Sequence, residues 1–320
     1  MAMLRRRSLI ATLLAFVLVL AACGSDDSAD TTTTVAPDSP LASTTTTVAE
    51  ETTTTAPAEE TTTTVEVFDV QAAVAEYAAN IPEGWMAVSD TTAFKDAVEA
   101  SGALVIDVRE EGEYAEGHIM DAINIPLRTL GDNLDKIPTD RQVFIYCKSG
   151  WRAGLGTSSL AMMGYDNVLA YPPGWNGWTA AGEEISTTAV EAEVVGDPGL
   201  QPEMVEAVGS FLSTIPEGWL SAGDATAVSD AIEAGAFVLD VREPGEFAEG
   251  HIPTAVNVPV RELGATDVEF PTDVTMIHYC KSGWRAALAL PILHMQGYDS
   301  DKGFSGSWLA WTEAGLPRES

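Results

Sequence analysis

The stretch that decides the fold reads Val143-Phe144-Ile145-Tyr146-Cys147-Lys148-Ser149-Gly150-Trp151-Arg152, and it returns as Met276-Ile277-His278-Tyr279-Cys280-Lys281-Ser282-Gly283-Trp284-Arg285. In each copy a strand-like run leads into an identical loop, and a run rich in alanine and leucine follows. A strand, a tight turn and a helix in this order are typical of an open α/β sheet, whose chemistry gathers at the carboxyl ends of the strands. The sequence therefore predicts two such units, each with a cysteine at the end of a buried strand.

The position of each cysteine favours its thiolate form. Unpaired backbone N–H groups converge where a helix begins, and the helix dipole adds partial positive charge there. Arg152 and Arg285, the last residues of the two loops, each add a full positive charge. Such surroundings make a cysteine nucleophilic at neutral pH. We therefore expect Cys147 and Cys280 to be the catalytic residues of two copies of one site.

The size of the loop narrows the chemistry. Four residues separate Cys147 from Arg152, and four separate Cys280 from Arg285. Cysteine phosphatases use a loop one residue longer, wide enough to hold a phosphate against the sulfur. A smaller ring of amides suits a smaller guest, such as one extra sulfur atom on the cysteine. The spacing therefore favours sulfur transfer over phosphate or arsenate chemistry.

The other loop residues are candidates for binding the substrate or the persulfide. The glycine allows the loop to turn its amides inward, the serine can donate a hydrogen bond, and the tryptophan can line the pocket mouth. The lysine favours an exposed position, and the arginine either stabilises an anion or pairs with a carboxylate as a brace. These candidates are Lys148, Ser149, Gly150, Trp151 and Arg152 in the first unit, and Lys281, Ser282, Gly283, Trp284 and Arg285 in the second.

Further motifs recur at fixed places before each loop. The first unit carries Asp107-Val108-Arg109-Glu110, Glu116-Gly117-His118-Ile119 and Asn124-Ile125-Pro126, and the second carries Asp240-Val241-Arg242-Glu243, Glu249-Gly250-His251-Ile252 and Asn257-Val258-Pro259. This order of motifs, ending in a C-x-x-G-x-R loop, closely resembles the rhodanese homology domain. The resemblance covers roughly residues 85–183 and 219–318.

The resemblance implies a fold and a reaction. The fold is α/β, with two rhodanese-like domains, each an open and mainly parallel sheet with helices on both faces. The reaction is that of a sulfurtransferase, similar to thiosulfate sulfurtransferases, in which the thiolate takes sulfane sulfur from a small donor and holds it as a persulfide. A thiol or a cyanide-like acceptor then removes the sulfur. No metal, nucleotide or flavin cofactor is implied.

The resemblance also implies supporting roles for residues outside the loops. Asp107, Arg109, Asp240 and Arg242 are implied to brace the active-site side of the sheet as structural support. His118 and His251 have the chemistry of a general base, but their place in a Gly-His-Ile motif favours a hydrogen-bonded loop residue. His278 is expected to be a strand residue, since Ile145 occupies the equivalent position.

Two alternatives of other classes stay open. A non-enzymatic persulfide carrier or redox sensor would keep both cysteines but show little turnover. A binding module would use the folds and tolerate the replacement of cysteine by serine. The donor is also open, because some thiosulfate-using relatives carry a basic residue where this chain has Glu113 and Glu246.

The spacing of apolar residues predicts the elements of the first unit. Helices are expected at residues 70–79, 92–100, 151–163 and 175–181, and strands at residues 103–108, 122–125, 142–146 and 168–171. Asp90 or Thr91 is the expected cap of the second helix. The second unit is expected to be softer, because Pro291 falls inside the helix after Cys280 and Asp301-Lys302 replaces Val168-Leu169.

The amino terminus predicts export. Three arginines precede a short apolar run at residues 9–20, and Leu20-Ala21-Ala22-Cys23 resembles a lipobox, in which Cys23 is lipidated. The run is too short to favour a permanent membrane span. The expected product is an extracytoplasmic protein that a lipid anchor holds at the cell membrane.

The chain divides into five predicted segments. They are a signal peptide at residues 1–22, a threonine-rich disordered tether at 23–64, a first domain at 65–185, a linker at 186–202 and a second domain at 203–320.

The formal net charge of −32 argues against binding to nucleic acid. Three cysteines exclude a disulfide-stapled fold, and no cluster has the spacing of a zinc site.

Overall fold

The computed structural model describes residues 67–320. The predicted signal peptide, the lipidation at Cys23 and the threonine-rich tether therefore lie outside the described residues. Within residues 67–320, none of the helices has the length and apolar character that crossing a membrane requires.

Each repeat builds a four-stranded, entirely parallel sheet. The first sheet has the order β3-β1-β4-β5, with bounds Ile123–Asn124, Leu104–Asp107, Val143–Tyr146 and Val168–Ala170. The second has the order β8-β7-β9-β10, with bounds Val256–Asn257, Phe237–Asp240, Met276–Tyr279 and Asp301–Gly303. The buried central strands explain the continuous apolar runs, since both faces of each sheet are covered. The predicted α/β fold is confirmed.

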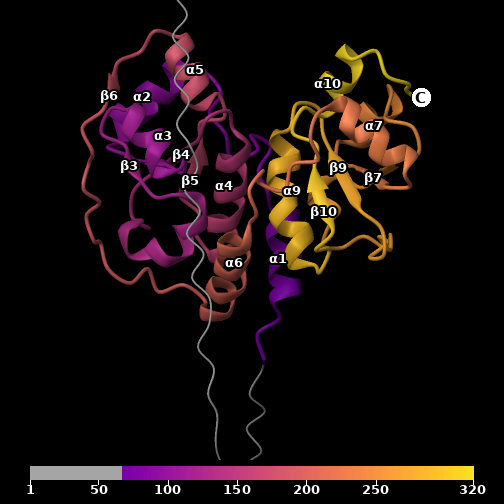
Figure 1. Ribbon diagram of the computed structural model, residues 1–320. Coiled ribbons are helices and arrows are strands. Elements are labelled where there is room, and N and C mark those ends of the chain that lie inside the picture. Colours follow the sequence, from indigo (N-terminus) through magenta and orange to yellow (C-terminus); the bar gives the residue numbers. More distant parts are fainter. Residues whose placement is uncertain (1–66) are drawn as a thin grey trace, which may run out of the picture. The chain divides into compact units, whose positions relative to one another are not determined.

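Helices flank both sheets (Figure 1). The first repeat has α2 (Thr91–Ser101), α3 (Glu111–Glu116), η1 (Leu127–Lys136), α4 (Trp151–Met163) and α5 (Gly174–Ala180). The second has α7 (Ala225–Glu233), α8 (Pro244–Ala248), η2 (Val260–Glu262), α9 (Trp284–Met295) and α10 (Ser307–Glu313). The predicted helices and strands of the first repeat are confirmed to within one residue at each end. Asp90 is the cap of α2, where its carboxylate accepts from the Ala93 amide at 2.8 Å.

Four elements of the first repeat were not predicted. They are α3, η1 and an antiparallel pair formed by β2 (His118–Ile119) and β6 (Ile185–Ser186). The linker after β6 contains no helix or strand up to residue 201, but it is tied to the first repeat. The Val190 amide donates to the Tyr114 hydroxyl at 3.1 Å, and the Val195 amide donates to the Asp135 carbonyl at 2.7 Å.

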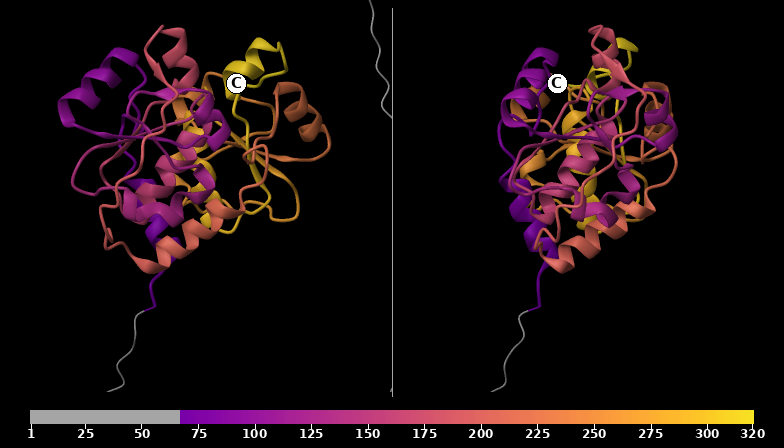
Figure 2. Two further views of the ribbon diagram at one scale, coloured as in Figure 1. Left: turned by 60° about the vertical axis from the view of Figure 1, so that its left-hand side comes forward. Right: turned by 90° about the vertical axis from the view of Figure 1, so that its left-hand side faces the viewer.

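The outer and inner faces of the sheets are covered differently. Outer clusters lie under α2 and α5 in the first repeat, around Phe94 and Tyr171, and under α7 and α10 in the second, around Phe304 and Trp311. The inner faces share one continuous core that draws residues from both repeats. Figure 2 shows the first repeat in indigo to magenta and the second in orange to yellow.

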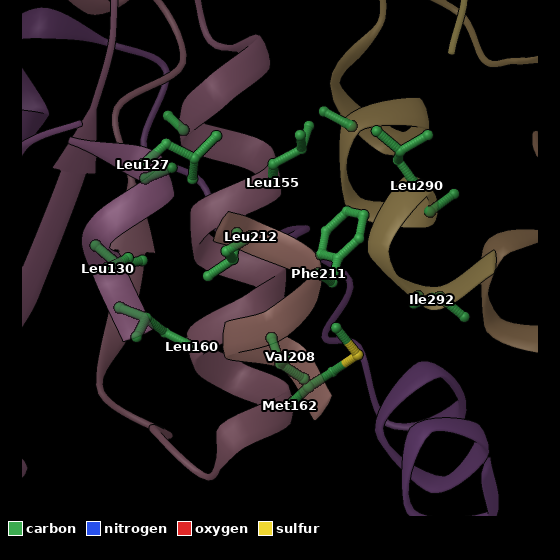
Figure 3. Close-up of a cluster of buried hydrophobic side chains, with 14 of the residues drawn as sticks. Leu127, Leu130, Leu155, Leu160, Met162, Val208, Phe211, Leu212, Leu290 and Ile292 are labelled. Atoms are coloured by element: carbon green, nitrogen blue, oxygen red, sulfur yellow. The ribbon is translucent and has the colours of Figure 1, made fainter. Parts of the chain in front are cut away.

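Each repeat places its first helix on the other repeat. Helix α1 (Val70–Ala79) packs on α9 and η2 of the second repeat, whereas α6 (Pro202–Thr214) packs on η1 and α4 of the first. The contacts are close: a Cβ on Gly131 would lie 2.9 Å from the Cα of Gly209, and a side chain on Gly264 would overlap Ala75. Figure 3 shows Phe211 of α6 among the side chains of this core.

Helices α4 and α9 meet at equivalent positions. Gly154 and Ala287 lie 133 residues apart in the sequence, and a Cβ on Gly154 would be only 2.5 Å from that of Ala287. The Ser158 hydroxyl of α4 donates to the Leu288 carbonyl of α9 at 2.9 Å. This bond lies one turn before Pro291. Because proline has no backbone N–H, residue 291 cannot donate the usual hydrogen bond within the helix. Helix α9 nevertheless continues through Pro291 to Met295.

The second sheet replaces apolar contacts with a buried polar pair. His278 in β9 and Asp301 in β10 occupy the positions of Ile145 and Val168 in the first repeat. Both side chains are completely buried, and Nδ1 of His278 lies 2.8 Å from Oδ1 of Asp301. Nε2 of the same ring lies 2.8 Å from the Ala286 carbonyl. Asp301, whose presence predicted a softer strand β10, is therefore paired with His278 in the neighbouring strand β9.

Candidate active sites

The two cysteines end the central strands β4 and β9. Both thiols are free, and each residue is only 1% exposed. The Gly150 amide donates to Sγ of Cys147 at 3.2 Å, and the Gly283 amide donates to Sγ of Cys280 at 3.1 Å. Each loop therefore turns at least one backbone donor toward its sulfur, which stabilises a thiolate or a persulfide.

Glycine is required at the turn of each loop. Gly150 has φ +95° and Gly283 has φ +97°, in the region that disfavours side chains. A Cβ on Gly150 would also lie 2.7 Å from the Pro172 carbonyl oxygen, and one on Gly283 would overlap the Ser305 carbonyl. Any larger residue would push the loop away from the segment behind it and move the amide that faces the sulfur.

The segment behind each loop holds it through backbone bonds. The Trp175 amide donates to the Cys147 carbonyl at 2.8 Å, and the Asn176 amide donates to the Lys148 carbonyl at 3.0 Å. In the second repeat, the Trp308 amide donates to the Cys280 carbonyl at 3.0 Å. The loops are therefore built by the same main-chain contacts in both repeats.

One side chain distinguishes the second site. Ser307 stands where the first repeat has Gly174, and it keeps a left-handed φ of +51°. Its hydroxyl oxygen accepts from the Cys280 amide at 3.1 Å and lies 3.7 Å from Sγ of Cys280. Ser307 could not be predicted from the loop motif, because it follows the cysteine by 27 positions and belongs to no motif of its own.

The loop arginines are paired with carboxylates. Arg152 contacts both oxygens of Glu113 at 2.5 and 2.8 Å, and Arg285 contacts both oxygens of Glu246 at 2.5 and 2.7 Å. The hydrogen bond from Arg152 holds the pKa of Glu113 below its usual value, and Arg285 does the same for Glu246. The structure shows the pairing with a carboxylate that a brace requires, and stabilisation of an anion by these arginines stays a prediction.

The residues expected to support the sheet form a buried network. Arg109 donates to Asp107 and to the Gly117 carbonyl, the latter at 2.7 Å, while the Tyr146 hydroxyl donates to Asp107 at 2.6 Å. Burial raises the pKa of Tyr146, so the phenol stays a neutral donor. In the second repeat the corresponding network joins Asp240, Arg242, Tyr279 and the Gly250 carbonyl.

The motif histidines face the protein backbone. His118 is fully buried, with Nδ1 at 3.0 Å from the Tyr114 carbonyl and Nε2 at 3.1 Å from the Thr188 carbonyl. Nδ1 of His251 lies 3.1 Å from the Phe247 carbonyl. These contacts are those of hydrogen-bonded loop residues, which is the role the sequence favoured.

The remaining loop candidates lie at the surface or border a cavity. Lys148, Ser149, Lys281 and Ser282 are exposed. Residues 149–151 and 282–284 border one cavity of about 670 Å³, so both loops open onto the same space. The described residues that line this cavity are all uncharged. Within residues 67–320, no cluster of histidine, cysteine or acidic side chains is arranged to hold a metal ion.

Each loop tryptophan reaches the other repeat. The indole N–H of Trp151 donates to the Trp219 carbonyl at 2.9 Å, and that of Trp284 donates to the Trp85 carbonyl at 2.9 Å. Trp85 and Trp219 end the two Ile-Pro-Glu-Gly-Trp segments, which the sequence shows as a repeat but does not place near a cysteine. The recurrence of this segment before both domains is the sequence signal that could have indicated a role for the two tryptophans.

Comparison with known proteins identifies the repeats. The family model described as Rhodanese-like domain matches residues 90–181 and 224–314. A sulfurtransferase of Allochromatium vinosum is 36% identical over 80 residues, which are 25% of this chain and 75% of that protein. The chloroplastic thiosulfate sulfurtransferase 16 of Arabidopsis thaliana is 33% identical over 107 residues, covering 30% of this chain and 89% of the relative.

A solved structure aligns with more of the chain. The crystal structure of a thiosulfate sulfurtransferase from Pseudomonas aeruginosa has 18% sequence identity and a TM-score of 0.31. The alignment covers 79% of this chain and 70% of that one.

Proposed function

Because this chain belongs to the rhodanese-like domain family through both of its repeats, we propose that it is an exported sulfurtransferase that works through a cysteine persulfide. The relatives named as sulfurtransferases support sulfur transfer at the family level. The observation that carries the proposal is the loop itself: in both repeats a buried free thiol accepts from a glycine amide. Four residues separate that cysteine from the loop arginine, one fewer than in cysteine phosphatases.

The proposed reaction has two displacements without net oxidation. The Cys147 or Cys280 thiolate attacks the outer sulfur of a donor R–S–SH; the donor S–S bond breaks, and its electron pair leaves with R–S⁻. An acceptor thiolate then attacks the outer sulfur of the enzyme persulfide, forms a new S–S bond and releases the cysteine thiolate. The glycine amide that faces Sγ stabilises the anionic sulfur in both steps.

The charges around the site favour a donor of low charge. Arg152 and Arg285 are occupied by Glu113 and Glu246, and the lining of the shared cavity is neutral. The net charge of −32 also repels anions within the screening distance of about 8 Å at physiological salt. We therefore infer that an organic persulfide is a better donor than the dianion thiosulfate.

An assay of the full chain carrying Cys23→Ser tests this function, because only Cys147 and Cys280 then remain as thiols. The purified protein is incubated with thiosulfate, 3-mercaptopyruvate or glutathione persulfide, and each cysteine peptide is analysed by mass spectrometry. A gain of one sulfur at both cysteines, followed by transfer to glutathione or cyanide, is the expected result. The variant with both cysteines replaced by serine is the control.

The outcomes separate the candidate functions. Persulfide formation without turnover would point instead to a sulfur carrier. If no donor modifies either cysteine and aryl phosphates are hydrolysed, the proposal is wrong.

Insertion of one glycine between Cys147 and Arg152, with Cys280 replaced by serine, should abolish sulfur transfer if loop size selects the guest.

Export is part of the proposal. The charged start, the short apolar run and the lipobox-like Leu20-Ala21-Ala22-Cys23 support a lipid anchor on Cys23. The threonine-rich segment between Cys23 and the first domain would hold the catalytic repeats away from the membrane surface.

A further inference from the structure

The Ile-Pro-Glu-Gly-Trp turns have an unusual backbone. Trp85 and Met86 have φ values of 53° and 52°, and Trp219 and Leu220 have values of 60° and 55°. Two consecutive bulky residues in the left-handed region are uncommon, and such strain persists only where the surroundings enforce it. The same strain in both repeats indicates that the position of this tryptophan is under constraint.

Contacts with the other repeat supply the constraint. Arg128, at the start of η1, donates to the Ile215 and Pro216 carbonyls at 2.7 and 3.0 Å. Its guanidinium carbon lies 4.0 Å from the ring centre of Trp219. In the second repeat, Arg261 donates to the Ile81 carbonyl at 2.8 Å and lies 4.1 Å from the ring centre of Trp85.

The far side of the contact is the catalytic loop. The guanidinium carbon of Arg152 lies 4.9 Å from the ring centre of Trp219, while the Trp151 indole donates to the carbonyl of the same residue. Arg285 lies 5.3 Å from the ring centre of Trp85, whose carbonyl accepts from Trp284. Trp219 therefore contacts two consecutive residues of the Cys147 loop, and Trp85 contacts their equivalents in the Cys280 loop.

These contacts fix the groups nearest the sulfur. A cation over an indole face is attracted by the ring, and the ring also excludes water from one side of the guanidinium. Arg152 closes the loop that begins at Cys147, and Arg285 closes the loop that begins at Cys280. Trp151 directly follows Gly150, whose amide donates to Sγ. Anchoring the tryptophan and the arginine together therefore fixes the orientation of the loop.

We propose that each repeat completes the active site of the other: Trp219 is a positioning residue for Cys147, and Trp85 is a positioning residue for Cys280. This inference rests on the proposed function for its biological meaning, but it concerns the reactivity of the thiols themselves. Loss of either indole should slow the cysteine of the opposite repeat and leave the cysteine of its own repeat unchanged.

Thiol alkylation tests the crossed pattern independently of sulfur transfer. In the full chain carrying Cys23→Ser, the rates of modification of Cys147 and Cys280 by iodoacetamide are measured across pH by mass spectrometry. Trp219→Leu, which fills volume without an aromatic face, should slow Cys147 by about fivefold. Cys280 in the same molecule is the internal control.

Matched variants separate positioning from folding. Trp219→Phe keeps an aromatic face and should recover much of the Cys147 rate, and Trp85→Leu should reverse the pattern by slowing Cys280 alone. Equal effects on both cysteines, a direct rather than crossed pattern, or identical rates for the leucine and phenylalanine variants would overturn the assignment. If no donor forms a persulfide but the crossed alkylation pattern appears, the proposed function fails and this inference stands.

Discussion

At the scale of single residues, Arg152 and Arg285 each face two partners, a carboxylate of their own repeat and an indole of the other. A buried guanidinium without a partner is costly, so each pair is retained only where its geometry is good. Here each carboxylate receives two short hydrogen bonds, and the indole covers the guanidinium. The arginines therefore serve to hold the loop.

The carboxylates predict a dependence of stability on pH. Arg152 and Arg285 lower the pKa values of Glu113 and Glu246 below the usual 4.5, so the ionised pairs stabilise the fold above that pH. This stabilisation is lost as the pH falls through the lower folded pKa values. A variant with Glu113→Gln and Glu246→Gln should therefore lose less stability than the parent between pH 6 and about pH 3. Urea denaturation at a series of pH values measures this, and parallel curves would contradict it.

The sequence predicts single residues well where their role depends on neighbours in the chain. The strand before Cys147, the glycine at the turn and the helix after it are local, and the structure contains each of them. Trp219 is different, because it reaches Arg152 only through the exchange of α6 between the repeats. No local periodicity encodes such a contact. The sequence alone therefore predicts the loop, but not the tryptophan of the other repeat that packs on it.

At the scale of elements, equivalent strand pairs of the two sheets bury different kinds of side chain. The pairing of β4 and β5 buries Ile145 and Val168, whereas β9 and β10 bury His278 and Asp301. Single substitutions in a buried polar pair leave a polar group without its partner, but replacing both members with apolar groups is often neutral or favourable. Ile145 and Val168 of the first repeat are the apolar equivalents of His278 and Asp301.

A double-variant cycle follows from this comparison. Asp301→Val alone should destabilise the protein by about 1–3 kcal/mol, because the buried Nδ1 of His278 loses its hydrogen-bond partner. Adding His278→Ile copies the first repeat and should recover most of that loss, with coupling measured from chemical denaturation of all four proteins. Additive losses would show that the pair is not coupled.

The catalytic contributions of the repeats should also differ. Pro291 removes a backbone donor from α9, and β10 holds the sheet edge through a polar pair, so local opening is expected to be easier in the second repeat. Cys147→Ser should therefore remove more sulfurtransferase activity than Cys280→Ser. Hydrogen exchange should be faster at residues 297–308 than at 164–175. Equal protection, with a larger loss from Cys280→Ser, would reverse the ranking.

At the scale of the whole molecule, the sequence predicts its two halves as consecutive units, whereas packing joins them. Periodicity places α1 correctly but does not show which sheet it covers, because an apolar helix face fits either repeat. The close approaches of Gly131 to Gly209 and of Gly264 to Ala75 settle the partners. The two homologous repeats therefore pack around one shared core.

Membrane attachment is tested at the same scale. Cys23→Ala should release the protein from the membrane fraction or leave an unprocessed precursor, because the lipid would lose its attachment site. Fractionation of cells expressing the parent and the variant, followed by mass measurement of the mature amino terminus, provides the check. Cys147→Ser serves as the control for loss of a thiol, and unchanged retention of the Cys23→Ala protein would contradict lipidation.

Exchange of the first helices predicts that the repeats stay together without a covalent link. A protease site inserted after Gly199 lies in the linker, where residues 187–201 contain no helix or strand. After cleavage the fragments should co-elute in native size-exclusion chromatography and separate only in denaturant, because α1 and α6 remain buried against the opposite repeats. Both cysteines should keep their alkylation rates, since Trp85 and Trp219 stay in place. Two folded fragments that elute separately, each with an unchanged cysteine, would show that each repeat is complete by itself.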